Sequence, residues 1–150
     1  MSIKMSLLLL PLLLLASALL ETISVARDNV GTASYYSSPY QPTECYGGEP
    51  SQFPSSNLFA AASDDVWDNG AACGRQYLVQ CISASRPGTC ISNCTIQVTI
   101  VDYALSSTSA AAAPKQSVRG TTLVLSQTAF GAIGNPSVTS IDIKFQRGVV

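Results

Sequence analysis

The side chains that could do chemistry in this chain are carboxylates and thiols, because the sequence contains no histidine. Ser-His-Asp and Cys-His catalytic groups both need an imidazole as their base, so the sequence excludes them. Nine acidic and eight basic residues give a net charge of −1. Lys and Arg form no cluster of the kind that binds nucleic acid, and we expect no nucleic-acid partner. Any acid–base catalysis would have to use carboxylates alone.

The chain has five cysteines, which are Cys45, Cys73, Cys81, Cys90 and Cys94. Their spacing matches no zinc pattern, and no histidine could complete such a site, so we expect no metal and no cofactor. In an oxidising compartment they would form disulfides, and their odd number leaves one thiol unpaired.

The only N-glycosylation sequon, Asn93-Cys94-Thr95, includes one of these cysteines. Either Asn93 carries a glycan, or it stays unmodified because cysteine in the middle position makes a poor acceptor.

The N-terminus has the pattern of a secretory signal peptide. Lys4 precedes an apolar run over residues 5–20, and small residues lead to Ala26. A membrane span is the alternative interpretation, but the run is shorter than the roughly 20 apolar residues that a span needs. We therefore expect residues 1–26 to be cleaved. Residues 27–150 should form one secreted domain that does not insert into a membrane.

Alternating apolar residues and turn signals outline the elements of that domain. They predict strands at 31–36, 76–82, 95–101, 121–125 and 138–145, and an apolar segment at 58–62. Ser63 precedes a single helical turn, and Ser126 caps a short helix that ends at Gly131 or Gly134. Long loops separate these elements, including the alanine-rich 106–120. Short strands with long loops predict a small β-barrel.

Several segments, in this order, resemble a known family. They are residues 31–36 (GTASYY), 60–63 (AAAS), 67–74 (WDNGAACG), 100–103 (IVDY), 123–126 (LVLS) and 129–130 (AF). The ordered set resembles the plant natriuretic peptide and blight-associated protein group. These are single-domain double-psi β-barrels related to the first domain of expansins and to family-45 endoglucanases. The resemblance spans almost all of residues 27–150 and implies a mainly β fold, a six-stranded, disulfide-stapled barrel with one or two short helices.

By analogy with expansins, the resemblance implies the disulfides Cys45–Cys73 and Cys81–Cys90, which leaves Cys94 as the odd thiol. A Cys81–Cys94 link, with Cys90 free, is the alternative. Many relatives carry a further cysteine after the Val-Asp-Tyr motif, where this chain has Ala104.

The resemblance also shows where a hydrolase would hold its two carboxylates, an acid for the leaving oxygen and a base for water. The base would follow the first strand, where this chain has Ser37-Ser38. The acid would occupy the position of Val124. Both catalytic carboxyl groups are therefore missing from these positions, and we expect a protein that is not an enzyme.

Asp102 is an acidic residue in a family-matched position, at the end of a predicted strand. It either binds ligand hydroxyls on the floor of a groove or caps a turn by accepting backbone amides. Tyr35, Tyr36 and Tyr103 either line the same groove or pack at the barrel rim. Trp67 fits the core better than a ligand platform. A lytic reaction that uses Asp102 alone is the remaining enzymatic alternative.

The expected function is therefore non-catalytic. The first hypothesis is an apoplastic signal in stress and in water and ion homeostasis, which acts through a cell-surface receptor. The alternative is a module that binds or loosens wall polysaccharide, and weakly so, because the second domain of expansins is absent here. We expect a monomer in either case.

Overall fold

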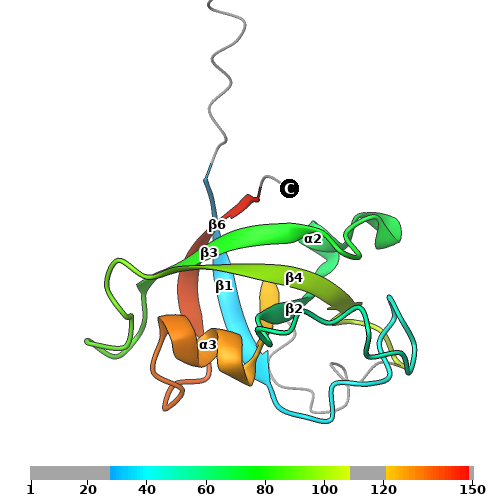
Figure 1. Cartoon of the computed structure of the whole chain (residues 1–150). Helices are drawn as coiled ribbons and strands as arrows, with labels where there is room; N and C mark the ends of the chain where they lie inside the picture. The colour runs from blue at the N-terminus through cyan, green and yellow to red at the C-terminus, as the bar shows by residue number, and fades with distance from the viewer. Residues whose placement is uncertain (1–27, 109–120, 149–150) are drawn as a thin grey trace, which may run out of the picture.

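Six strands close into a barrel in the computed structural model, which describes residues 28–108 and 121–148 (Figure 1). Around the barrel the strands follow the order β1-β5-β2-β4-β3-β6. Their bounds are β1 Asn29–Tyr36, β2 Phe59–Ala62, β3 Gln76–Ser83, β4 Thr95–Tyr103, β5 Leu123–Ser126 and β6 Ile141–Arg147. The expected mainly β, six-stranded barrel is confirmed. The predicted signal peptide lies outside the described residues, as does most of the alanine-rich loop.

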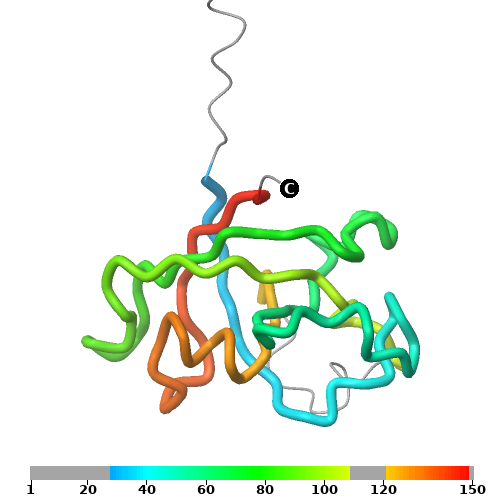
Figure 2. The backbone as a smooth tube through the Cα atoms, in the orientation of Figure 1, coloured from blue at the N-terminus to red at the C-terminus, as the bar shows by residue number. Residues whose placement is uncertain are grey.

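The barrel combines two parallel strand pairs with four antiparallel ones. β1 runs parallel to β5 and β2 runs parallel to β4, while the other neighbours are antiparallel. The connection between β1 and β2 travels around one end of the barrel before the chain re-enters the sheet (Figure 2). This segment, residues 37–58, covers part of the outer surface of the barrel wall.

Two short helices and a 3-10 turn follow strands. α2 is Asp64–Trp67, which runs into the 3-10 turn η1 at Asp68–Gly70, and α3 is Gln127–Ile133. Ser126 caps α3 as predicted, because its Oγ accepts a hydrogen bond of 3.1 Å from the backbone N of Ala129. Ser63 makes no such side-chain cap bond for α2.

Some strand ends differ from the sequence-based expectation. β6 begins at Ile141 rather than at residue 138, because residues 135–138 form a turn in which Asn135 Oδ1 accepts the Ser137 amide at 3.0 Å. β4 extends through Tyr103 rather than ending at residue 101, so Asp102 is the next-to-last residue of the strand, at its end as expected.

The barrel wall separates two apolar clusters. The interior holds alternate strand residues with at most 1% exposure, such as Val79, Ile100, Leu125 and Ile143. The second group, which we name the outer apolar cluster, lies on the other face of the wall and consists of Tyr36, Phe59, Ala61, Val101, Ala104 and Val124. Tyr40, Tyr46 and Phe53 of the 37–58 segment pack over it. This segment therefore closes one face of the barrel.

Two disulfides hold loops to the barrel. Cys45–Cys73 joins the 37–58 segment to the turn that follows η1, and Cys81–Cys90 closes the connection between β3 and β4. This is the pairing that the resemblance implied. Cys94 is the free cysteine of the described residues, and its Sγ donates to the Ala132 carbonyl at 3.1 Å. In the part of the chain that the structure describes, no helix is long and apolar enough to cross a membrane.

Candidate functional site

The position matched to a hydrolase acid lies inside the outer apolar cluster. Val124 is in the middle of β5 with 2% exposure, packed among Tyr36, Phe59 and Val101. Its isopropyl group can neither give nor take a proton, and its surroundings exclude water. Ser37, at the position of the base, is exposed just after β1. Neither position holds a carboxylate.

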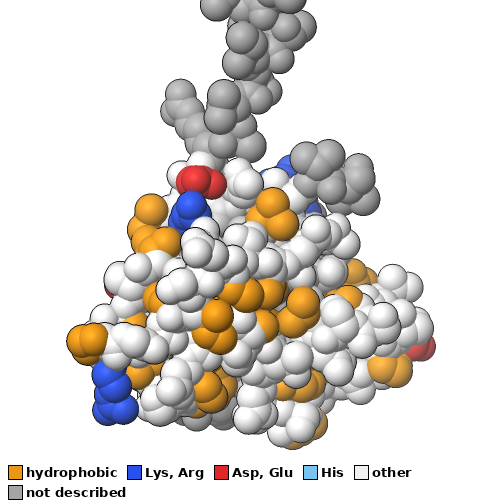
Figure 3. Space-filling view, turned by 60° about the vertical axis from the view of Figure 1, so that its left-hand side comes forward, with side chains coloured by type: hydrophobic (Ala, Val, Ile, Leu, Met, Phe, Trp, Pro, Cys, Tyr) orange, Lys and Arg blue, Asp and Glu red, His pale blue; other side chains and the backbone are white. Residues whose placement is uncertain are grey.

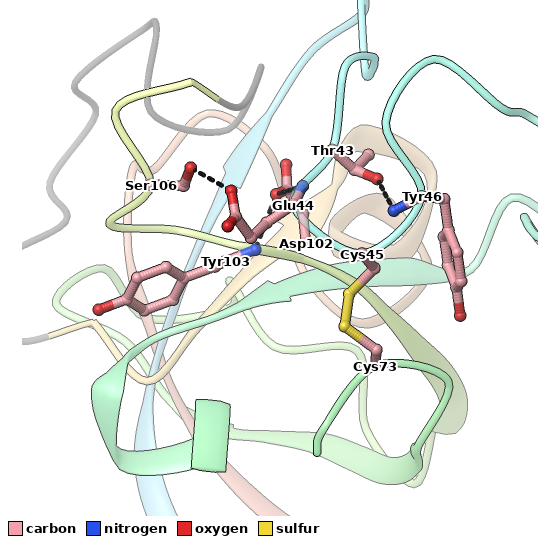
Figure 4. The surroundings of a disulfide bond; sticks show 8 residues. All are labelled: Thr43, Glu44, Cys45, Tyr46, Cys73, Asp102, Tyr103 and Ser106. Atoms are coloured by element: carbon pink, nitrogen blue, oxygen red, sulfur yellow. Dashed lines mark hydrogen bonds between the residues drawn. A yellow bond between two sulfur atoms is a disulfide. The ribbon is translucent and has the colours of Figure 1, made fainter. Parts of the chain in front are cut away.

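Asp102 is completely buried, with 0% exposure, near the end of β4. Its Oδ1 accepts two backbone hydrogen bonds, from the N–H of Glu44 at 2.8 Å and from the N–H of Tyr103 at 2.7 Å (Figure 4). Charge-assisted bonds of this kind are strong, and here they join the 37–58 segment to β4. The geometry is that of the structural alternative, a carboxylate that caps a turn, and the side chain does not reach a surface.

The turn that covers Asp102, residues 43–47, is held by its own hydrogen bonds. Thr43 and Gly47 exchange backbone bonds of 2.8 and 2.9 Å, and Thr43 Oγ1 accepts the Tyr46 amide at 2.9 Å. The Cys45–Cys73 disulfide fixes its centre, and Glu44 accepts the Ser106 hydroxyl at 2.7 Å (Figure 4). We call these residues the cover turn. These hydrogen bonds and the disulfide hold the cover turn against the barrel, so it closes the space above Asp102.

The adjacent Tyr35 and Tyr36 point to opposite faces of β1. The Tyr35 ring lies 4.6 Å from that of Phe130, and its hydroxyl donates to the Pro136 carbonyl at 2.9 Å. Tyr36 has 1% exposure and belongs to the outer apolar cluster. Burial, and then the negative charge of Asp102, raise the pKa of Tyr36 far above its ordinary value. Strand geometry thus places the two tyrosines on opposite faces of β1, and the outer apolar cluster encloses Tyr36.

Tyr103 instead forms an aromatic pair with Trp67. The two rings stack with centroids 4.7 Å apart and an interplanar angle of 18°. The Tyr103 hydroxyl donates to Asp64 at the start of α2, and this bond raises the pKa of Tyr103. Both rings are half-buried, so Trp67 packs against the core and also contributes to the surface. Figure 4 shows Tyr103 pointing away from the Cys45–Cys73 disulfide.

A hollow of about 600 Å³ lies beside this pair, at the barrel end where β1 begins. Polar groups of α2 and neighbouring strands meet apolar ones from β3 and β6. The lining consists of Asn29, Val30, Asp64, Asp65, Val66, Asp68, Arg75, Tyr77, Thr122 and Phe145. We name it the α2 hollow. The sequence did not indicate it, because its residues come from three strands, a helix and the segments next to them, which are distant in the chain.

The charges of the α2 hollow are mostly negative. Arg75 is paired with Asp68 at 2.7 Å, which leaves Asp64 and Asp65 as the carboxylates without a cationic partner among the lining residues. Asp64 belongs both to the hollow and, through Tyr103, to the aromatic pair. Within residues 28–108 and 121–148, no group of three or more candidate ligands could hold a metal ion. The arrangement offers hydrogen-bond acceptors beside flat apolar faces.

Comparisons with known proteins place this fold in a family. Residues 59–145 match a double-psi β-barrel family model described as lytic transglycolase. An EG45-like domain containing protein of Citrus jambhiri is 34% identical over 127 residues, 83% of this chain and 85% of that protein. A putative EG45-like domain containing protein 1 of Arabidopsis thaliana is 32% identical, over 87% of this chain and 92% of its own length. The chain belongs to the EG45-like double-psi β-barrel family.

Solved expansin structures share the fold. The apo expansin of Clavibacter michiganensis superposes with a TM-score of 0.55 at 20% identity, over 82% of this chain. A point mutant of that expansin in complex with cellohexaose gives a TM-score of 0.56. This chain spans 51% of the length of each expansin. The protein thus shares its β-barrel fold with these expansins.

Proposed function

We propose that this protein is a secreted, non-catalytic member of its family that contacts wall polysaccharide at the α2 hollow and the Trp67–Tyr103 pair. One observation carries the non-catalytic part. The hydrolase acid position, Val124, lies in an apolar cluster, and the nearby carboxylate Asp102 is held by two backbone amides beneath the cover turn. Glycoside hydrolysis by the usual route needs two carboxyl groups across one cleft.

The chemistry of the α2 hollow favours a neutral sugar. Asp64 and Asp65 can accept hydrogen bonds from sugar hydroxyls, and the stacked rings give a flat apolar face for a pyranose. Uncompensated carboxylates would repel the uronates of pectin. The cellohexaose complex of the related expansin supports a neutral β-glucan as the ligand class. At about 600 Å³ the hollow has the size of a small-ligand site.

The test is retention of the secreted protein on insoluble cellulose, xylan and polygalacturonate. We expect retention on the two neutral polymers, little on polygalacturonate, and no release of reducing ends. Asp65→Asn should lower retention, because it replaces an exposed carboxylate that lines the hollow by a neutral amide, whose single oxygen is a weaker acceptor. Glu49→Gln is the matched control, an equal charge change on the exposed 37–58 segment. Release of reducing ends by the wild type, lost in a folded Asp102→Asn variant, would make the protein a lytic enzyme.

A second function, signalling through a cell-surface receptor in stress and water balance, has its own support. The cover turn and the outer apolar cluster close the barrel face where Asp102 and Val124 lie. A closed, side-chain-filled face suits a protein partner better than a polysaccharide chain. Saturable binding to intact plant cells, together with no retention on any polysaccharide, would establish this function over the first.

Both functions need export. We propose that residues 1–26 are removed as a signal peptide and that the mature chain, residues 27–150, acts as a monomer in the apoplast. N-terminal sequencing of the secreted protein should begin at Arg27, and light scattering should give the monomer mass. An N-terminus that retains the apolar run would contradict the cleavage.

A further inference from the structure

The connection between β3 and β4 presents its sequon on the surface. The connection projects from the barrel as the loop at the left of Figure 1. Asn93 lies in the turn just before β4 with a φ of 56°, a left-handed conformation that asparagine tolerates better than most residues. Asn93 and Thr95 are both exposed. The amide and the hydroxyl that a glycosyl transferase must reach are thus accessible.

The cysteine in the middle of the sequon turns inward and is not cross-linked. Cys94 is half-buried against the barrel core, and its Sγ donates to the Ala132 carbonyl at 3.1 Å. The disulfide of this region is Cys81–Cys90, which ends before the sequon begins. A disulfide at Cys94 would fix the sequon during folding, but the free thiol leaves it open to the transferase. No disulfide at Cys94 therefore restrains the sequon.

We propose that Asn93 carries an N-linked glycan, an inference that rests on the export of the chain proposed above. The side-chain nitrogen of Asn93 forms a bond to the anomeric carbon of an oligosaccharide supplied by a lipid diphosphate donor. The bond between that carbon and the diphosphate oxygen breaks. The lipid diphosphate leaves, and one amide proton passes to a base of the transferase. No electrons are exchanged with an oxidant or reductant.

The glycan would stand over a partly apolar corner of the surface, next to the Cys94 thiol. The Ile91 amide donates to the Ile133 carbonyl, and Cys94 bonds the preceding carbonyl, so both residues lie against the end of α3. Ile91 is 44% exposed, and Ile82, next to Cys81, is 45% exposed. The face in Figure 3 shows hydrophobic side chains in many separate spots. A glycan on Asn93 shields Ile91 from association and the Cys94 thiol from forming an intermolecular disulfide.

The experiment expresses the full chain in a plant cell host and follows the secreted form. We expect treatment with a peptide N-glycosidase to remove the mass of one glycan, and peptide mapping to place it on Asn93. Thr95→Ser should keep the glycan, while Thr95→Ala should lose it. Secreted wild-type protein with unmodified Asn93 would overturn the proposal.

A second chain, in which a known secretory signal replaces residues 1–26, separates the two ideas. If only this chain is secreted and it is glycosylated, residues 1–26 do not act as a signal peptide, but the proposed glycan on Asn93 stands. If it is secreted without a glycan, the site is wrong. Asn93→Gln should form reductant-sensitive dimers, and Asn93→Gln with Cys94→Ser should not. A monomeric Asn93→Gln protein would overturn the shielding role.

Discussion

An aspartate at the position of Asp102 could have either of two roles, binding a ligand or holding the backbone. A carboxylate on a groove floor would bind a ligand, but this one accepts two backbone amides under the cover turn. Sequence identified the residue and left both roles open. The difference arises from residues 37–58, whose path over the barrel no local pattern predicts.

Asp102→Ala should therefore lower stability rather than only weaken binding. Two charge-assisted hydrogen bonds are lost, and the free energy of unfolding should fall by about 2–4 kcal/mol. Urea denaturation at pH 7 measures the loss. Asp102→Asn is the matched control, because its amide oxygen can still accept both N–H groups. An alanine variant as stable as the wild type would show that the cover turn does not depend on Asp102.

The buried phenol of Tyr36 should make the stability of the fold depend on pH at alkaline pH. Its pKa is raised far above the ordinary value of 10.0, chiefly by burial. Above pH 10 the unfolded chain loses the phenol proton while the folded chain keeps it, so this group's contribution makes stability fall as pH rises. Tyr36→Phe should reduce that fall, seen in urea midpoints at pH 8 and pH 11.

At pH 7, Tyr36→Phe should change the free energy of unfolding little. Tyr36 Oη has no hydrogen-bond partner within the described residues, so Phe leaves no new unsatisfied group. Equal pH slopes for Tyr36→Phe and the wild type would contradict the assignment of the alkaline slope to this phenol.

At the scale of elements, α3 depends on a single side chain at its start. Ser126 Oγ accepts the Ala129 amide and donates to the Asn57 carbonyl at 2.7 Å, so it caps the helix and also holds the end of the 37–58 segment. Ser126→Ala should lower the free energy of unfolding by about 2 kcal/mol. Thermal unfolding followed by circular dichroism measures it.

Ser63→Ala is the control, since Ser63 has the same place before α2 but makes no side-chain cap bond. We expect a change below about 0.5 kcal/mol. Equal losses for the two variants would refute the difference between the caps.

Most elements were predictable because their signals are local. The alternation of Ile96, Val98 and Ile100 predicted β4, and Ser126 predicted the capped start of α3. The end of α3 was left open between Gly131 and Gly134, and the structure has it at Gly134. The predicted start of β6 was wrong. Val138 is β-branched and favours a strand, but the turn that Asn135 forms with Ser137 delays the strand to Ile141. The barrel order came from the resemblance, since strand pairing is not encoded in any single segment.

The candidate site was predictable only in part. Asp102 and Tyr103 were singled out, but their separation was not foreseen, because adjacent strand residues point to opposite faces. The Trp67–Tyr103 stack joins residues that are 36 positions apart, and the α2 hollow draws on three strands and on α2. A sequence shows which residues alternate, whereas the twist and closure of the barrel decide which of them meet.

At the scale of the whole molecule, the two disulfides should contribute unequally. Cys45–Cys73 spans 28 positions and Cys81–Cys90 spans 9. In the chain-entropy model, replacing the first pair by serine should cost about 3–4 kcal/mol and the second about 2–3 kcal/mol. Guanidinium unfolding of each double variant measures this order. Cys94→Ser should change stability little, and a reversed order would mean that native contacts outweigh loop entropy.

The burial of Val124 has a consequence for how this chain could change. A Val124→Asp substitution would restore the acid's residue type but not its surroundings. The new carboxyl group would meet Tyr36, Phe59 and the 37–58 segment instead of solvent, and it would remain protonated in the folded state. A carboxyl group at this position would meet solvent only if the 37–58 segment took another path over the barrel. The path of the 37–58 segment thus limits what a single substitution in β5 could add to the chemistry of this barrel.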